Sequence, residues 1–134
     1  MKTIFADSSF WIALRDKREQ YHSIAKSLAS EMLEAKTTFV ITVMVFAETH
    51  AYFSRELVLR ERIIRDFWEN PVIQIEPISH QDQVEAINIL RRHKDKRYSL
   101  CDAISFAIIR RLQMTQALSF DAHFEQFGEF NVIS

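Results

Sequence analysis

Glycine is almost absent from this sequence, and cysteine is nearly so. Gly128 is the only glycine among 134 residues, which excludes the glycine-rich loops that cradle phosphates in P-loop and dinucleotide-binding proteins. Cys101 is the only cysteine, which excludes an internal disulfide and fits a reducing compartment. If this protein handles phosphate groups, it must therefore do so with metal ions and side chains.

Long hydrophobic runs and a large excess of one charge are also missing. No stretch approaches the ~18 consecutive apolar residues of a membrane helix, and no signal-peptide pattern is present. We therefore expect a cytoplasmic protein with no membrane association. Because the net charge is only −1, a polyanionic partner would have to bind a local basic patch rather than the protein as a whole.

The sequence does contain enough apolar residues to fill one core. Hydrophobic residues make up 48% of the chain and 11 of them are Phe, while 134 residues is an ordinary length for one domain. We therefore expect a single domain over residues 1–134. Within it, Cys101 is expected to be a small, buried core residue.

Short β-type segments alternate with helical segments along the chain. Runs rich in β-branched and aromatic residues predict strands at 2–6, 37–42, 72–78, 116–120 and 130–133. Apolar spacing predicts helices at 10–15, 21–35, 43–55, 57–69, 81–92, 99–112 and 122–127. Thr42 and Ser79 are expected to cap the helices that follow them, and Gly128 is expected to end the last helix. The alternation predicts an α/β fold with a mainly parallel five-stranded sheet, helices on both faces and the last strand at an edge.

Two helices carry specific expectations about burial. On the helix at 81–92, the spacing of Val84, Ile87 and either Leu90 or Arg91 predicts the face that packs on the core. Glu48 follows an apolar run, so we expect it to be buried, where an ionised carboxylate is costly unless a partner compensates it. The helices at 43–55 and 57–69 carry four aromatic residues of interest, Tyr52, Phe53, Phe67 and Trp68. At least half of these four are expected in the core.

Four acidic residues stand at junctions between apolar segments. Asp7 follows the first predicted strand and Asp121 follows the fourth, so both fall at the carboxyl edge of the sheet, where open α/β sheets bind ligands. Glu48 and Asp102 lie early in helices that leave the same edge. Any one of these carboxylates could simply cap a helix or face water. Four at one rim would repel one another and would attract a divalent cation.

The segment Ser99-Leu100-Cys101-Asp102 opens the most apolar helix of the chain. Ser99 is placed to cap this helix, and the carboxylate of Asp102 gains from the positive end of the helix dipole. An acidic, water-excluded cluster without a P-loop suits metal-assisted hydrolysis of phosphodiester bonds. The sequence therefore predicts a catalytic metal site made of Asp7, Glu48, Asp102 and Asp121.

In this order and spacing, these residues resemble the PIN-domain family, and the chain length resembles the VapC-like toxins of type II toxin–antitoxin pairs. The resemblance covers essentially the whole chain and is carried by Asp7-Ser8-Ser9, Glu48, residues 99–102 and Ser119-Phe120-Asp121. It implies a three-layer α/β/α fold and an Mg²⁺- or Mn²⁺-dependent ribonuclease whose metal ligands are the four acids. It also implies that the hydroxyls of Ser8 and Ser119 support the metal site. Ser119 stands where the family commonly has Thr, but it retains the hydroxyl.

The family resemblance also implies an RNA substrate, a VapB-like antitoxin that inserts a segment near the active groove, and a homodimer. A PIN-like module that binds RNA or protein without cutting is the alternative. A degenerate member of that kind would be expected to have lost at least one of the four acids, and this chain keeps them all.

Basic residues are concentrated just before the helix that carries Asp102. A phosphate backbone would need such cations beside an acidic site, although a solvated loop would have the same composition. The candidates for RNA binding are Arg91, Arg92, Lys94, Lys96 and Arg97. His123, two residues after Asp121, is a further candidate to border the site, although a lone His is more often structural or solvent-facing.

Overall fold

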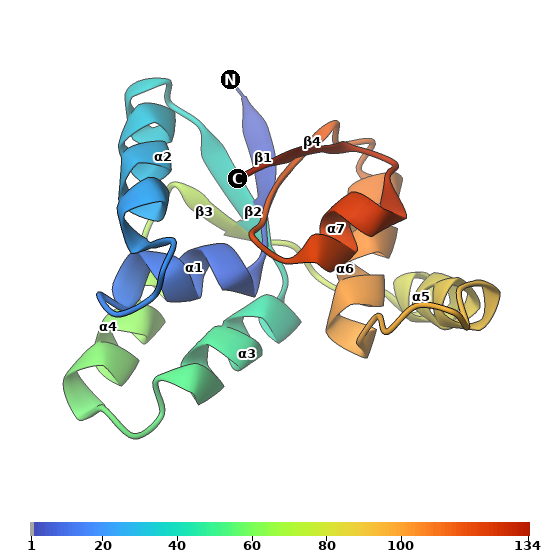
Figure 1. Cartoon of the computed structure of the whole chain (residues 1–134), viewed down its shortest axis with the longest axis horizontal. Coiled ribbons are helices and arrows are strands. Elements are labelled where there is room, and N and C mark those ends of the chain that lie inside the picture. The colour runs from blue at the N-terminus through green and yellow to red at the C-terminus, as the bar shows by residue number, and fades with distance from the viewer. Residues whose placement is uncertain (1) are drawn as a thin grey trace.

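A five-stranded parallel sheet runs through the centre of the computed structural model, which describes residues 2–134 (Figure 1). Its strands pair in the order β3-β2-β1-β4-β5, and every pairing is parallel. The strands are β1 (Thr3–Ala6), β2 (Thr38–Ile41), β3 (Ile73–Ile75), β4 (Gln116–Leu118) and β5 (Asn131–Ile133). The predicted sheet and the edge position of β5 are confirmed. The strands are shorter than predicted, and β3 ends just before Pro77, which has no N–H for a sheet ladder.

Seven helices cover the two faces of this sheet. Figure 1 shows α1 to α4 on one side and α5 to α7 on the other, which gives the expected three-layer α/β/α arrangement. The helices are α1 (Ser8–Arg15), α2 (His22–Glu34), α3 (Val43–Tyr52), α4 (Leu57–Trp68), α5 (His80–Arg92), α6 (Leu100–Arg111) and α7 (Ala122–Phe127). The chain leaves β1 toward β2 on one side, and β4 lies on its other side, so the order of the strands reverses between β1 and β4. Such a switch point is where open α/β sheets bind ligands.

Polar side chains begin the helices that leave the carboxyl edge of the sheet. Asp7 caps α1 by accepting a hydrogen bond from the N–H of Ser9, and Asp121 caps α7 by accepting one from His123. Thr42 caps α3 as predicted. Gly128 ends α7 in the left-handed region, with φ of 74°, where glycine carries no Cβ penalty.

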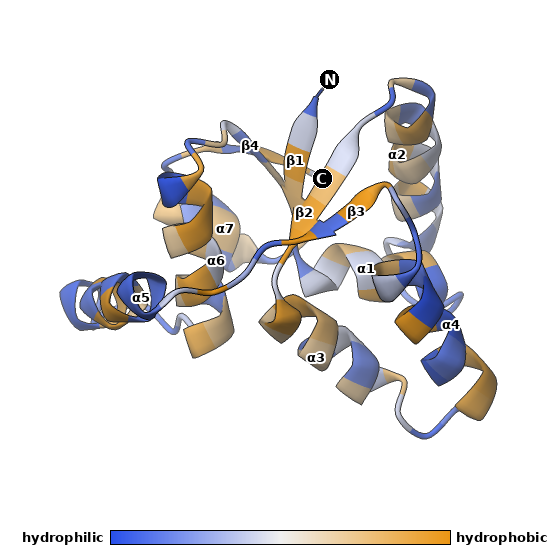
Figure 2. Ribbon diagram, turned by 180° about the vertical axis from the view of Figure 1, so that it is seen from behind, coloured by the Kyte–Doolittle hydropathy of each residue, from blue (hydrophilic) through white to orange (hydrophobic). Residues whose placement is uncertain are grey.

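The core lies between the sheet and its covering helices. Every residue of α6 from Cys101 to Ile109 is buried, as expected for the most apolar helix of the chain. Figure 2 shows apolar residues along the strands and many polar ones on α4 and α5. Phe53 and Phe67 are buried, which confirms that half of the four aromatic residues on α3 and α4 belong to the core. No helix among residues 2–134 has the length and apolar character needed to span a bilayer.

The predicted inner face of α5 is wrong for Val84 and Ile87, whereas Leu90 is partly buried and packs against the core. Val84 and Ile87 are 39% and 42% exposed, whereas Asp82, Ala86 and Ile89 are buried. The cause is an ion pair that the apolar spacing does not encode. Asp82 accepts hydrogen bonds of 2.9 and 3.2 Å from the guanidinium of Arg111 on α6, so the face of α5 that carries Asp82 turns toward α6.

Candidate active site

A cleft of about 690 Å³ opens at the carboxyl edge of the sheet. All four predicted acids line it, together with the predicted supporting residues Ser8 and Ser99. The lining residues are Asp7, Ser8, Ser9, Ile12, Glu48, Ala51, Tyr52, Ser99, Asp102, Asp121 and His123. Residues that are far apart in the sequence therefore share one concavity, and none of the residues that line it is Lys or Arg.

Asp7 forms the buried floor of the cleft, directly after β1. Its Oδ2 accepts hydrogen bonds from the hydroxyls of Ser9, at 2.9 Å, and Ser119, at 3.0 Å. These hydroxyls in turn accept hydrogen bonds from the backbone N–H groups of Phe120 and Asp121. Two backbone donors thus orient the hydroxyls that hold Asp7. Within residues 2–134 no hydrogen bond reaches Oδ1 of Asp7, so this oxygen is left for another ligand.

The electrostatic environment of Asp7 opposes its negative charge. Burial raises the pKa of its carboxyl to about 6, and the neighbouring charges of Asp102 and Asp121 add to that rise, against the opposing hydrogen bonds from Ser9 and Ser119. The buried carboxylate is therefore poorly compensated by the protein itself. A cation in the cleft would supply the missing charge.

Asp102 is held in the first turn of α6 by a reciprocal pair of hydrogen bonds with Ser99. The Ser99 hydroxyl accepts from the N–H of Asp102, and Asp102 Oδ2 accepts from the N–H of Ser99, both at 3.0 Å. The predicted cap is thus a complete capping box. Burial is nevertheless the largest influence on this carboxyl and raises its pKa.

The capping box of α5 shows what Asp102 lacks. Ser79 and Asp82 repeat the geometry of Ser99 and Asp102. Arg111 pairs with Asp82, and although burial opposes it, the pKa of Asp82 is lowered. The two aspartates have the same local structure, but Arg111 balances the charge of Asp82, whereas Asp102 lies among the other acids of the cleft.

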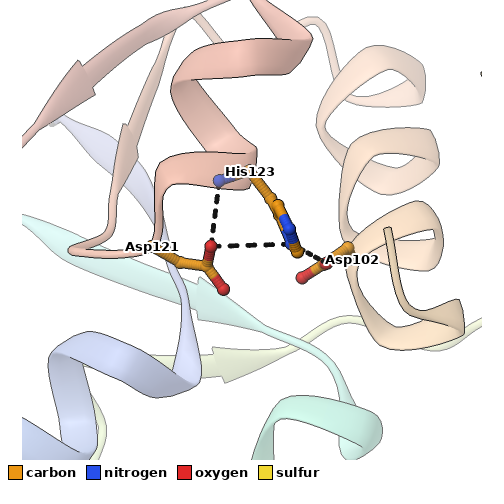
Figure 3. A group of neighbouring side chains, drawn as sticks. All are labelled: Asp102, Asp121 and His123. Atoms are coloured by element: carbon orange, nitrogen blue, oxygen red, sulfur yellow. Dashed lines mark hydrogen bonds and ion pairs between the residues drawn. The ribbon is translucent and has the colours of Figure 1, made fainter. Parts of the chain in front are cut away.

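His123 on α7 lies between Asp102 and Asp121 (Figure 3). Its Nδ1 is 2.8 Å from Asp102 Oδ2 and 3.6 Å from Asp121 Oδ1. One ligand atom from each of these three residues falls within 4.8 Å of the others, the spacing of a possible metal site. Asp7 and Glu48 line the same cleft but are not part of this closest group.

Glu48 stands at the rim of the cleft and is exposed, so the expectation that it is buried is wrong. The buried side of α3 is formed by Val45 and Thr49 instead. Glu48 is nevertheless positioned, because the Ser8 hydroxyl donates a 2.7 Å hydrogen bond to its Oε1. The apolar run before Glu48 was misleading, since α3 begins at the open edge of the sheet and turns one face toward the cleft.

Cys101 is buried beside these acids, as expected. Burial is the main cause of its strongly raised thiol pKa, and the carboxylates of Glu48, Asp7 and Asp102 add to it. A thiol in this environment stays protonated and is a poor nucleophile. Its place next to Asp102 is therefore structural.

The basic run lies outside the cleft. All five of its predicted RNA-binding residues are exposed: Arg91, Arg92, Lys94, Lys96 and Arg97. None of them is among the residues that line the acidic cleft. The run ends two residues before Ser99, which does line the cleft, so Arg97 lies closer to the site along the chain than Arg91 does.

Sequence reasoning missed part of the site. It did not assign a role to Ser9, which holds Asp7 and accepts from Phe120 N–H, or to Tyr52, whose half-exposed side chain borders the cleft. For His123, the sequence indicated only a residue that could border the site. The sequence offered a signal for Ser9, since Asp-Ser-Ser after a strand places two hydroxyls near the carboxylate, but none for Tyr52.

The three-layer α/β/α architecture, with an acidic cleft at the switch point of a parallel sheet, defines a class of α/β proteins whose ligand site is rich in carboxylates. The family model described as "PIN domain" matches residues 4–129. This chain belongs to the PIN-domain family.

A named relative is similar to this chain over nearly its whole length. The chain is 31% identical over 127 residues to the 23S rRNA-specific endonuclease VapC20 of Mycobacterium tuberculosis, covering 93% of this chain and 94% of that protein. It matches the crystal structure of M. tuberculosis VapC20, a sarcin–ricin loop cleaving toxin, with a TM-score of 0.84 and 27% identity, covering 98% and 99% of the two chains.

Two toxin–antitoxin structures share the fold at lower identity. VapBC2 from Rickettsia felis, bound to a DNA fragment from their promoter, has a TM-score of 0.70 at 11% identity, with coverage of 98% and 97%. A toxin–antitoxin complex from Klebsiella pneumoniae has a TM-score of 0.67 at 18% identity, with coverage of 98% and 96%. These two matches establish the fold alone.

Proposed function

We propose that this chain is a metal-dependent endoribonuclease and the toxin of a VapBC-type toxin–antitoxin pair. The observation that supports this most is the gathering of Asp7, Glu48, Asp102 and Asp121 around one cleft with no Lys or Arg in its lining. Together with the family membership and the endonuclease relative, this arrangement favours hydrolysis of RNA phosphodiester bonds.

The donor set of the cleft fits a hard divalent cation such as Mg²⁺ or Mn²⁺. Carboxylate oxygens are the ligands these ions prefer, and burial together with the charges of Asp102 and Asp121 raises the pKa of Asp7 despite its hydrogen bonds, as expected for a site that lacks a cation. Asp102 and Asp121 would bind an ion most directly, and Asp7 and Glu48 would bind it directly or through water. A bound ion would polarise the scissile phosphodiester and lower the pKa of an attacking water.

The side chains around the acids fix their orientation. Ser9 and Ser119 hold Oδ2 of Asp7, which leaves Oδ1 for the cation, and Ser8 holds Oε1 of Glu48 at the rim. The backbone of Ser99 holds Oδ2 of Asp102. Each of these hydrogen bonds restrains a carboxylate before a cation binds, so that less conformational freedom is lost on binding. Residues that contact metal ligands support metal sites in this way.

A PIN-like module that binds RNA or protein without cutting is the weaker alternative. A binding module has no need for four converging carboxylates, and acids in the path of a phosphate backbone would repel RNA unless cations bridged them. The relative that is 31% identical carries the name of an endonuclease. These observations favour catalysis.

Substrate and partner follow from the relatives. Because the VapC20 name specifies 23S rRNA, we propose a structured ribosomal RNA as the first substrate to test. We also propose a VapB-like antitoxin as a partner, in keeping with the toxin–antitoxin complexes among structures of the same fold. A homodimer, which the family resemblance implies, and a cytoplasmic location, expected from the sequence, remain predictions.

The proposed activity is tested by cleavage of ribosomal RNA with the purified chain. Cleavage should require Mg²⁺ or Mn²⁺, stop in EDTA and return when the ion is restored in excess. Cleavage at the full rate in EDTA would overturn the metal mechanism. If no RNA is cut with either ion while the chain still binds RNA, the non-catalytic alternative replaces the proposal.

A further inference from the structure

We propose that His123 is a direct ligand of the bound ion and shifts the binding preference of the site from Mg²⁺ toward Mn²⁺. The inference rests on the proposed function, because it names a further ligand for the ion that the cleft would hold. His123 is the only residue lining the cleft with a nitrogen in its side chain. Any nitrogen ligand that comes from a side chain around this cleft must therefore be the imidazole of His123.

The distances around Nδ1 suit neighbouring ligands of one ion. Ligands at right angles, with bonds of about 2.0–2.2 Å, lie about 3 Å apart. Nδ1 of His123 is 2.8 Å from Asp102 Oδ2 and 3.6 Å from Asp121 Oδ1, which bracket that separation (Figure 3). All three ligand atoms lie within 4.8 Å of one another, and an ion bound among them would replace the present hydrogen bond between His123 and Asp102.

The ring of His123 is held in this orientation by its surroundings. The N–H of His123 donates a 2.9 Å hydrogen bond to Asp121 Oδ1, which fixes the backbone of α7 to one of the other ligands. The ring of Tyr98, itself buried, packs edge-on against the imidazole with 5.5 Å between centroids. The first contact fixes the backbone and the second limits rotation of the ring, so His123 loses little conformational freedom when an ion binds.

The chemistry of a nitrogen ligand sets the preference between ions. Mg²⁺ is a hard cation that strongly favours oxygen, whereas first-row transition ions accept imidazole more readily. The imidazole would bind in the tautomer that carries its proton on Nε2, leaving the Nδ1 lone pair for the ion. A cleft of acids alone would discriminate less between Mg²⁺ and Mn²⁺, so His123 makes the difference.

The test uses the intact purified chain with Mn²⁺ as the probe. Pulsed electron paramagnetic resonance of the Mn²⁺-loaded wild type should show the ¹⁴N coupling of a directly coordinated nitrogen, and His123→Gln should lack it. Titration calorimetry should show Mn²⁺ affinity falling at least about tenfold in His123→Gln, since loss of outer partners alone costs that much. Mg²⁺ affinity should change by less than about threefold, because Mg²⁺ gains little from nitrogen.

His50→Gln is the matched control, because His50 lies on α3 but does not line the cleft. Its Mn²⁺ spectrum and both affinities should equal those of the wild type. Wild-type Mn²⁺ without nitrogen coupling, persistence of the coupling in His123→Gln, or an equal loss of Mg²⁺ and Mn²⁺ affinity would each overturn the assignment of His123. The wild-type spectrum alone is decisive if the variant fails to fold. A wild type that binds neither ion would overturn the metal mechanism itself.

Discussion

Ser119 donates a 3.0 Å hydrogen bond to Asp7 Oδ2 and thereby joins residues that are 112 positions apart in the sequence. Asp7 follows β1 and Ser119 follows β4, and these strands are neighbours in the sheet. The hydrogen bond therefore spans the point where the strand order reverses. It ties the most buried acid of the cleft to the loop that carries Asp121.

Ser119→Ala should destabilise the protein by about 1–3 kcal/mol, because it removes one of the hydrogen bonds to the buried Asp7 carboxylate and leaves the N–H of Asp121 without its partner. Ser105→Ala is the control. Ser105 is equally buried, but its hydroxyl has no partner within residues 2–134, so this change should be neutral or stabilising. Urea unfolding measures both. Equal effects from the two changes would show that the Ser119 hydroxyl holds nothing.

Asp7→Asn should stabilise the metal-free protein at pH 8. The pKa of Asp7 is raised from 3.8 to about 6 in the folded state, so its charge opposes folding by up to about 3 kcal/mol above pH 6. As the pH falls through 6, the wild type takes up a proton and recovers stability, and near pH 3.8 the difference should be gone. Urea unfolding in EDTA at pH 8, 6 and 4.5 checks this. A variant less stable than the wild type at pH 8 would contradict the assigned repulsion.

Asp102→Asn and Asp82→Asn should have opposite consequences, although both residues occupy the same place in a capping box. Asp102→Asn should keep the fold and reduce RNA cleavage at least about 100-fold, the upper end of the loss seen for partners of metal ligands. Asp82→Asn should keep cleavage but lose about 1–3 kcal/mol of stability, because it breaks the pair with Arg111. Cleavage at the wild-type rate by Asp102→Asn would remove Asp102 from the catalytic site.

The basic run is tested by RNA binding in the cleavage-impaired Asp102→Asn background. The pair Lys96→Gln and Arg97→Gln should weaken binding, and each lost phosphate contact should flatten the plot of log affinity against log salt by about 0.7. Lys2→Gln with Lys36→Gln removes the same charge at the opposite edge of the sheet, where β1 and β2 begin, and should leave binding unchanged. Equal losses from the two pairs would indicate a general charge effect instead of a binding site.

The sequence predicted the layers and the sheet because each element carries its own local signals. Thr42, Ser79 and Ser99 cap helices as predicted, and Gly128 ends one. The convergence of the acids also followed from connectivity, since Asp7 and Asp121 each come directly after a strand and parallel strands end at one edge.

What could not be predicted depends on contacts between distant elements. The rotation of α5 is set by the ion pair of Asp82 with Arg111, and the local spacing of Val84 and Ile87 gave no hint of it. The exposure of Glu48 depends on which face of α3 meets the cleft. Likewise, no spacing rule indicates that His123 reaches Asp102 across 21 residues of sequence.

The most direct test of the proposed metal site is anomalous diffraction from crystals of the wild-type chain soaked in Mn²⁺. A cation held by the four acids should give an anomalous peak in the cleft, within bonding distance of Asp102 and Asp121 and close to Oδ1 of Asp7. A peak only at other surface carboxylates, or an empty cleft at a Mn²⁺ concentration that supports RNA cleavage, would contradict it.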